Sequence, residues 1–171
     1  MKKIAIRVDS SRSIGSGHLM RCLTLAQRLK KDCPAEIHFI CRDLEGNLNS
    51  LIESKGFFVH TLPRHFEKFN LSGYGDWLTV PQELDALETA EILKTLGIIQ
   101  RLIIDSYALD FRWENLVRSF CEEIFVIDDL ANRKHDCDFL LDQNFYSDKD
   151  LRYYQLVPKN CKLLIGPRYA L

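Results

Sequence analysis

Residues 4–21 read IAIRVDSSRSIGSGHLMR, and this stretch indicates the fold of the chain. It begins as a short apolar run typical of a buried strand, passes through a Ser/Gly-rich loop, and brings His18 to the expected start of a helix. A helix N-terminus offers free N–H groups and partial positive charge, which favour an anion and disfavour an imidazolium. We therefore expect an anion-binding loop beside a neutral His18 that can accept a proton.

Strand-like and helix-like segments alternate along the rest of the chain. Strands are predicted at residues 3–8, 36–41, 57–62, 102–105, 124–127, 139–142 and 163–165, and helices at residues 19–31, 47–55, 82–96 and 110–123. This alternation, with continuous apolar strands, predicts a Rossmann-like α/β domain with a doubly wound parallel sheet. Residues 63–81 contain prolines and glycines but no periodicity, so we expect a long loop there.

Composition narrows the class of protein. The chain has 171 residues, of which 46% are hydrophobic and 27% charged, as is ordinary for a globular domain. A net charge of −1 gives no electrostatic reason to bind nucleic acid or an anionic membrane, and no apolar run is long enough to predict a membrane span. The six cysteines form no Cys-x-x-Cys pair, so we expect free thiols, a cytoplasmic protein and no metal site.

Candidate site residues follow from the predicted sheet, because ligands of doubly wound sheets bind beyond the carboxyl ends of the strands. Polar or glycine residues at that edge are Asp9, Gly15, Gly17, His18, Asp105, Ser106, Tyr107 and Asn144. Arg21 is a further candidate, as a partner of a phosphate or carboxylate. From the residues alone, His18 is either a catalytic base or a helix-capping side chain, and Tyr107 is either a packed aromatic or a hydrogen-bonding partner of a substrate. We expect the pair Asp128 and Asp129 to stabilise a turn, with one carboxylate orienting His18.

Two further patterns have weaker functional interpretations. Gly15 and Gly17 suggest a dinucleotide-binding loop, but Met20 occupies the position where that fingerprint needs a third small residue, which argues against such a cofactor. The charged run at residues 132–136 is interpreted as a solvated surface loop.

Several segments in this order resemble one enzyme family. They are RVDSS (7–11), IGSGH (14–18), RC (21–22), DWLTV (76–80), QELDA (82–86), IDSY (104–107), IDDLA (127–131), DQN (142–144) and GPRYAL (166–171). Together they are similar to the UDP-2,4-diacetamido-2,4,6-trideoxy-β-L-altropyranose hydrolases of bacterial pseudaminic acid synthesis, along nearly the whole chain. The resemblance implies the N-terminal half of a GT-B architecture, with the active site in a cleft between two Rossmann-like domains.

The resemblance also implies a reaction and its residues. Water would attack the anomeric carbon of the UDP-sugar with inversion, without a metal or cofactor, and release UDP and the free sugar. The family's general base falls on His18 and its active-site tyrosine on Tyr107. We expect residues 1–160 to form the N-terminal domain and residues 161–171 to lead toward a second, UDP-binding domain, without which hydrolysis would be slow. The alternatives are a GT-B glycosyltransferase and a non-catalytic nucleotide-sugar-binding module.

Overall fold

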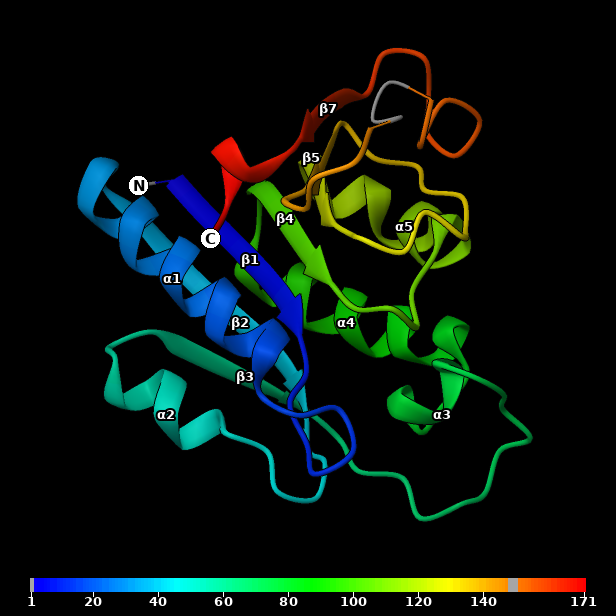
Figure 1. Cartoon of the computed structure of the whole chain (residues 1–171). Helices are drawn as coiled ribbons and strands as arrows, with labels where there is room; N and C mark the ends of the chain where they lie inside the picture. Colours follow the sequence, from blue (N-terminus) through cyan, green and yellow to red (C-terminus); the bar gives the residue numbers. More distant parts are fainter. Residues whose placement is uncertain (1, 148–150) are drawn as a thin grey trace.

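The computed structural model describes residues 2–147 and 151–171. Its strands form one seven-stranded sheet in the order β3-β2-β1-β4-β5-β6-β7, and every neighbouring pair is parallel (Figure 1). The strands are β1 (Lys2–Val8), β2 (Ala35–Arg42), β3 (Phe58–Leu62), β4 (Ile99–Asp105), β5 (Cys121–Ile127), β6 (Phe139–Asp142) and β7 (Lys162–Ile165). The predicted Rossmann-like, doubly wound α/β fold is confirmed.

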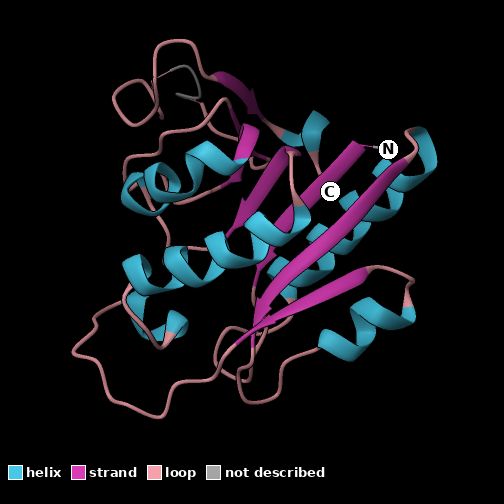
Figure 2. Cartoon of the chain, turned by 180° about the vertical axis from the view of Figure 1, so that it is seen from behind, coloured by secondary structure: helices cyan, strands magenta, loops and turns pink. Residues whose placement is uncertain are grey.

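Helices cover both faces of this sheet, as the two opposite views show (Figures 1 and 2). They are α1 (Gly17–Asp32), α2 (Asn49–Ser54), α3 (Gly75–Leu78), α4 (Gln82–Leu96) and α5 (Phe111–Val117), with 3-10 turns η1 (Arg118–Phe120) and η2 (Pro167–Tyr169). Side chains of α1 and α2 pack into one hydrophobic core, and those of α4 and α5 pack into the other. Strand β1 contributes to both, because alternate side chains of a strand point to opposite faces: Ile4 and Ile6 enter the first core and Ala5 the second.

The order of the strands places the functional edge. From β1 the chain passes to β2 and β3 on one side, and then returns to β4 and continues through β7 on the other. The carboxyl ends of β1 and β4 therefore lie next to each other where the winding reverses, with Val8 paired to Asp105. Such a switch point is the preferred ligand position of an open α/β sheet.

One predicted helix is too long. Residues 110–123 were expected to be helical, but α5 ends at Val117 and residues from Cys121 onward form β5. The same pairing extends β4 back to Ile99, three residues before the predicted start, because Ile99 lies opposite Cys121. Strand pairing between distant segments therefore overrides the helical preference of the local sequence.

Two loops also differ from expectation. The loop at residues 63–81 contains the short helix α3, and Leu78 and Val80 are buried, which anchors it to the core. The run at residues 132–136 is not simply a solvated surface loop. His135 is buried, with Nδ1 2.6 Å from Glu114 of α5, and Arg133 donates to Asp128 and to two backbone carbonyls. These side chains tie the loop to the domain.

Residues 161–171 continue the same sheet, since β7 pairs with β6. The division near residue 160 and the second domain beyond it remain predictions. Across residues 2–147 and 151–171, no helix has the length and apolar character needed to cross a membrane, and no His, Cys, Asp and Glu side chains cluster in threes to suit a metal ion.

Candidate active site

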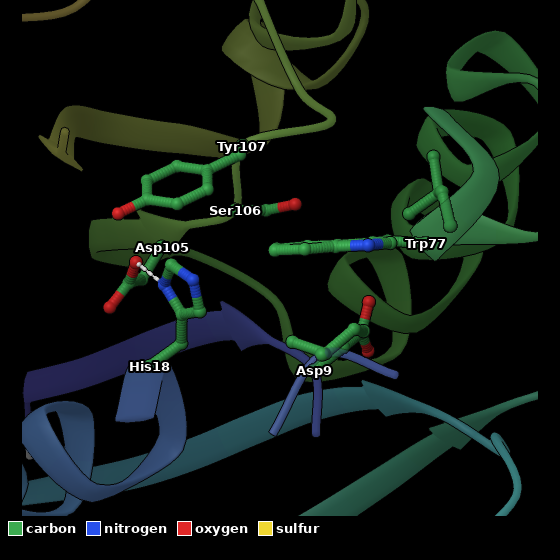
Figure 3. A pocket seen from close by; sticks show the side chains of 8 residues that line it. Asp9, His18, Trp77, Asp105, Ser106 and Tyr107 are labelled. Atoms are coloured by element: carbon green, nitrogen blue, oxygen red, sulfur yellow. Dashed lines mark hydrogen bonds and ion pairs between the residues drawn. The ribbon is translucent and has the colours of Figure 1, made fainter. Parts of the chain in front are cut away.

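A pocket opens at the switch point, beyond the carboxyl ends of β1 and β4 (Figure 3). It encloses about 250 Å³, part of it open to solvent, and is lined by Asp9, Ile14, His18, Trp77, Leu78, Asp105, Ser106 and Tyr107. Five of the residues predicted for the site, Asp9, His18, Asp105, Ser106 and Tyr107, thus meet in one place. The space inside it that the centre of a water-sized sphere can reach is only about 10 Å³, which is room for about one water molecule.

His18 lies in the first turn of α1, as predicted, and its ring is held by Asp105. Nδ1 of His18 lies 2.6 Å from Oδ1 of Asp105, whose side chain is buried. Arg21, one turn further along α1, donates to the same carboxylate from Nε at 2.5 Å and from Nη2 at 2.6 Å. The predicted role of Asp128 or Asp129 as the group that orients His18 is therefore wrong, because Asp105 is the carboxylate that β4 places directly opposite α1.

The protonation of this pair follows from its partners. Burial of Asp105 opposes ionisation, but hydrogen bonds from Arg21 and His18 outweigh burial and hold the pKa of Asp105 below its ordinary value. The ionised carboxylate can only accept hydrogen bonds, so Nδ1 of His18 carries a hydrogen. Arg21 Nη2 also lies 3.1 Å from Nδ1, but that N–H has Asp105 Oδ1 as its better acceptor. In the neutral form of the imidazole the lone pair is then on Nε2, which makes no hydrogen bond within the described residues.

Tyr107 packs against the imidazole. Its ring meets that of His18 edge to face, with centroids 4.5 Å apart, and its hydroxyl donates to Oδ1 of Asp129 at 2.5 Å. Burial and the bond to Asp129 raise the pKa of Tyr107 well above its usual value, so the phenol stays protonated near neutral pH. Because its hydrogen is given to Asp129, the phenolic oxygen can offer only lone pairs to a ligand.

Asp9 is fixed from behind by buried charges. Its Oδ1 accepts from Arg7 Nη1 at 2.6 Å and from the backbone N–H of Arg42 at 2.7 Å. Arg7 is bound in turn by Asp85 of α4, which also binds Arg42. Oδ2 of Asp9 has no hydrogen-bond partner in the described part of the chain, so one acceptor oxygen is available on the pocket wall.

Gly15 and Gly17 border the pocket through the loop that leads into α1. Gly15 has a φ of 80°, which only glycine adopts without strain, and a Cβ at either glycine would meet nothing within 4 Å. The loop therefore faces open space beside the N-terminus of α1, where backbone N–H groups are exposed.

The positions and contacts of Asn144 and Asp129 could not be predicted well from the sequence. Asn144 follows β6, is exposed and does not line the pocket, so its part in binding remains a prediction. Asp129 had no predicted contact with Tyr107 or Arg21, yet it accepts from the first and lies 3.5 Å from the second. Trp77, Leu78 and Ile14 also line the pocket and were not predicted to do so. The isolated tryptophan in an otherwise irregular loop was the one available signal.

Comparison with known proteins bears on the family resemblance stated from the sequence. No protein-family model matches the chain. The chain is similar to a Campylobacter jejuni enzyme named UDP-2,4-diacetamido-2,4,6-trideoxy-beta-L-altropyranose hydrolase, with 29% identity over 182 residues. This confirms the resemblance that the ordered segments indicate. The match covers 99% of this chain and 51% of the relative, so the chain spans about half the length of that protein.

Proposed function

We propose that this chain supplies the base-bearing half of a UDP-sugar hydrolase that acts on a 2,4-diacetamido-2,4,6-trideoxy sugar of the pseudaminic acid pathway. The observation that carries the proposal is the His18–Asp105 pair. It fixes the hydrogen on Nδ1 and leaves the basic Nε2 free beside an open pocket. The modest similarity to the Campylobacter hydrolase supports the proposed substrate class.

In the proposed reaction, His18 Nε2 accepts a proton from water as the water oxygen bonds to the anomeric carbon. The bond between that carbon and the phosphate oxygen breaks on the opposite face, and UDP leaves as an anion that needs no proton. Asp105 and Arg21 keep the imidazole oriented while it carries the extra proton. The phenolic oxygen of Tyr107 and the free oxygen of Asp9 present lone pairs to the electron-poor sugar of the transition state.

We expect a second domain to hold the uridine diphosphate. Arg7 and Arg21, which bind the pocket residues Asp9 and Asp105, are already paired with carboxylates of the protein. They have little capacity left for a diphosphate. The relative is about twice as long as this chain, and this length is consistent with a further domain. The 171-residue chain alone should therefore bind the UDP-sugar weakly and turn it over slowly, and full hydrolase activity in it would contradict this part of the proposal.

The test is hydrolysis in ¹⁸O-labelled water by the product of the complete gene. Attack at the anomeric carbon puts the label in the sugar, whereas label in UDP would contradict the mechanism. His18→Ala should lower kcat by about 10²-fold or more, the usual scale for a lost general base. His60→Ala, on edge strand β3 and outside the pocket, is the matched control and should leave kcat unchanged.

The same assay separates the alternatives. A glycosyltransferase would release UDP only when an acceptor sugar is added, and its product would be a glycoside. A non-catalytic binding module would bind the UDP-sugar without releasing UDP, and His18→Ala would then change no rate.

A further inference from the structure

Cys137 and Cys161 are two thiols to which the proposed reaction gives no task. Cys137 lies two residues before β6 and Cys161 immediately before β7, so both lie at the amino ends of neighbouring parallel strands, opposite the end that carries the pocket. Their Sγ atoms are 3.7 Å apart, although the two residues are 24 positions apart in the chain. The contact therefore depends on the pairing of β6 with β7.

The backbone beside this contact is fixed by other bonds. The N–H of Lys162 donates to the carbonyl of Asp138 at 2.9 Å, and the N–H of Cys161 donates to the carbonyl of Pro158 at 2.9 Å. Arg118 of η1 forms an ion pair with Asp138 at 2.5 Å. The two sulfur atoms are thus held in contact by the fold, and a disulfide between them requires a further approach to about 2.05 Å through rotation of the side chains.

The two thiols differ in exposure and in acidity. Cys137 is buried, whereas Cys161 is partly exposed and can be reached from solvent. The hydrogen bond from Cys137 lowers the pKa of Cys161, and the same bond together with burial raises the pKa of Cys137. Cys161 is therefore the thiol that forms a thiolate more readily, and the thiolate is the form that reacts with an oxidant.

We propose that Cys137 and Cys161 are the site of a reversible disulfide that forms when hydrogen peroxide reaches the chain. The thiolate of Cys161 attacks one oxygen of the peroxide, the O–O bond breaks, hydroxide leaves, and Cys161 becomes a sulfenic acid. The sulfur of Cys137 then bonds to the sulfur of Cys161, and the sulfenic hydroxyl leaves as water with the thiol proton of Cys137. In total, two thiols are oxidised to one disulfide and one peroxide is reduced to two water molecules.

The disulfide would fasten the outermost strand of the sheet. Strand β7 is the last in the strand order and pairs with β6 alone, over the four positions Lys162–Ile165 (Figure 1). The disulfide would join the chain just before β6 to the chain just before β7. The pocket lies at the opposite end of the strands, so this inference does not depend on the proposed function.

The expected gain in stability follows from the length of chain that the bond encloses. A cross-link between residues 24 positions apart removes conformations of the unfolded chain, and it should make the equilibrium constant for unfolding about 10²-fold smaller. For a domain of this size, that change corresponds to a rise in Tm of about 6–12 °C.

The test uses the 171-residue chain with Cys33→Ser, because Cys33 is an exposed thiol that could link two chains. The chain is treated with hydrogen peroxide, the remaining thiols are alkylated, and the disulfides are mapped by mass spectrometry. We expect a pair of peptides joined through Cys137 and Cys161, and a Tm about 6–12 °C above that of the reduced chain. Dithiothreitol should remove the link and restore the lower Tm.

Three variants in the same background complete the experiment. Cys161→Ala should give neither the link nor the rise in Tm. Cys137→Ala leaves the sulfenic acid of Cys161 without a thiol partner, so Cys161 should be oxidised further to the sulfinic acid. Cys121→Ala is the matched control and should keep both the link and the rise. Cys121 is also partly exposed and begins a strand, but its Sγ contacts the backbone carbonyls of Val117 and Arg118. The Tm of each reduced variant shows whether it is folded.

Two results would overturn the inference. If no peptide pair joined through Cys137 and Cys161 appears, and Cys161 either stays a thiol, becomes a sulfinic acid or joins another cysteine, the disulfide site is wrong. If the pair appears but the Tm of the oxidised chain does not rise, the disulfide does not fasten β7 to the sheet.

Discussion

Substitution of Asp105 by Asn tests the carboxylate on which the candidate site depends. Asp105 is buried and accepts charge-assisted hydrogen bonds from His18 Nδ1, Arg21 Nε and Arg21 Nη2, at 2.6, 2.5 and 2.6 Å. Asparagine has nearly the same shape, but it replaces one acceptor oxygen with an N–H donor. At least one of these bonds, worth about 1.5–3 kcal/mol, is lost, and a donor then faces a donor.

The rest of the loss in unfolding free energy comes from the charge of Arg21. Removing one partner of a buried ion pair typically costs about 3–5 kcal/mol, because the other charge stays buried. Arg21 keeps a weaker partner in Asp129, 3.5 Å away, so we expect Asp105→Asn to lower the free energy of unfolding by about 3 kcal/mol. For a domain of this size that corresponds to a fall in Tm of about 6–12 °C.

Urea and thermal unfolding at pH 7 measure this difference. Asp129→Asn is the matched control, because Asp129 is partly exposed, contacts Arg21 at the longer distance, and keeps an acceptor oxygen for Tyr107 as Asn. It should cost about 1 kcal/mol or less. A loss below about 1 kcal/mol for Asp105→Asn would refute the buried-pair reasoning.

The pH dependence gives a second check. Burial works against the charged form of Asp105, but Arg21 and His18 hold its folded pKa below the ordinary value. The ionised carboxylate therefore stabilises the fold at every pH above the unfolded pKa of about 3.9, and this contribution is lost as pH falls from there through the folded pKa. The difference between the unmodified chain and Asp105→Asn should shrink as the pH falls below about 4. A difference that grows as the pH falls from about 4 toward 2 would contradict this.

Further predictions concern other parts of the fold. Asp85→Asn should lower the free energy of unfolding by about 4 kcal/mol in urea titrations, because Asp85 is buried between Arg7, Arg42 and Trp113; a cost near zero would mean that the charges are solvated. Because burial and Asp129 raise the pKa of Tyr107, the unmodified chain and Tyr107→Phe should have the same phenolate absorbance up to about pH 10. A tyrosine that ionises below this pH in the unmodified chain and is missing from Tyr107→Phe would contradict the prediction. Gly46→Ala should cost about 1 kcal/mol of unfolding free energy, because Gly46 has a φ of 74° and its Cβ would lie 2.8 Å from Arg12 Cγ. Gly75→Ala, which has no such φ and no contact closer than 3.8 Å, is the control, and equal costs would remove the conformational explanation.

The fold could be predicted from the sequence where local signals decide it. The apolar run at residues 3–8, the Ser/Gly loop and the stripe of α1 each depend on residues close together in the chain, and the structure has all three. The start of β5 could not be predicted in this way. Residues 121–123 are compatible with a helix until Ile99–Arg101 are placed beside them, which is a contact between distant segments.

The candidate site likewise contains residues that the sequence can identify and contacts that it cannot predict. His18 and Asp105 could each be selected as residues that follow a strand, but their contact joins positions 87 apart in the chain. Only the strand order β1-β4, at the centre of the sheet, brings them together. Trp77 could not be found by periodicity, since the loop around it has none, and its position depends on the burial of Leu78 and Val80.

The two carboxylates of the pocket wall, Asp9 and Asp105, are paired with the buried Arg7 and the half-buried Arg21, whereas His18 and Trp77 stand in front of that framework. Genetic variation at these positions should therefore produce two distinct phenotypes. Changes at either aspartate reduce stability by enough to lower the amount of protein in a cell several-fold. Changes at His18 leave the Asp105–Arg21 pair in place, so they should reduce activity far more than the amount of protein. A mutational scan that measures abundance beside activity would separate the two groups without any ligand being known.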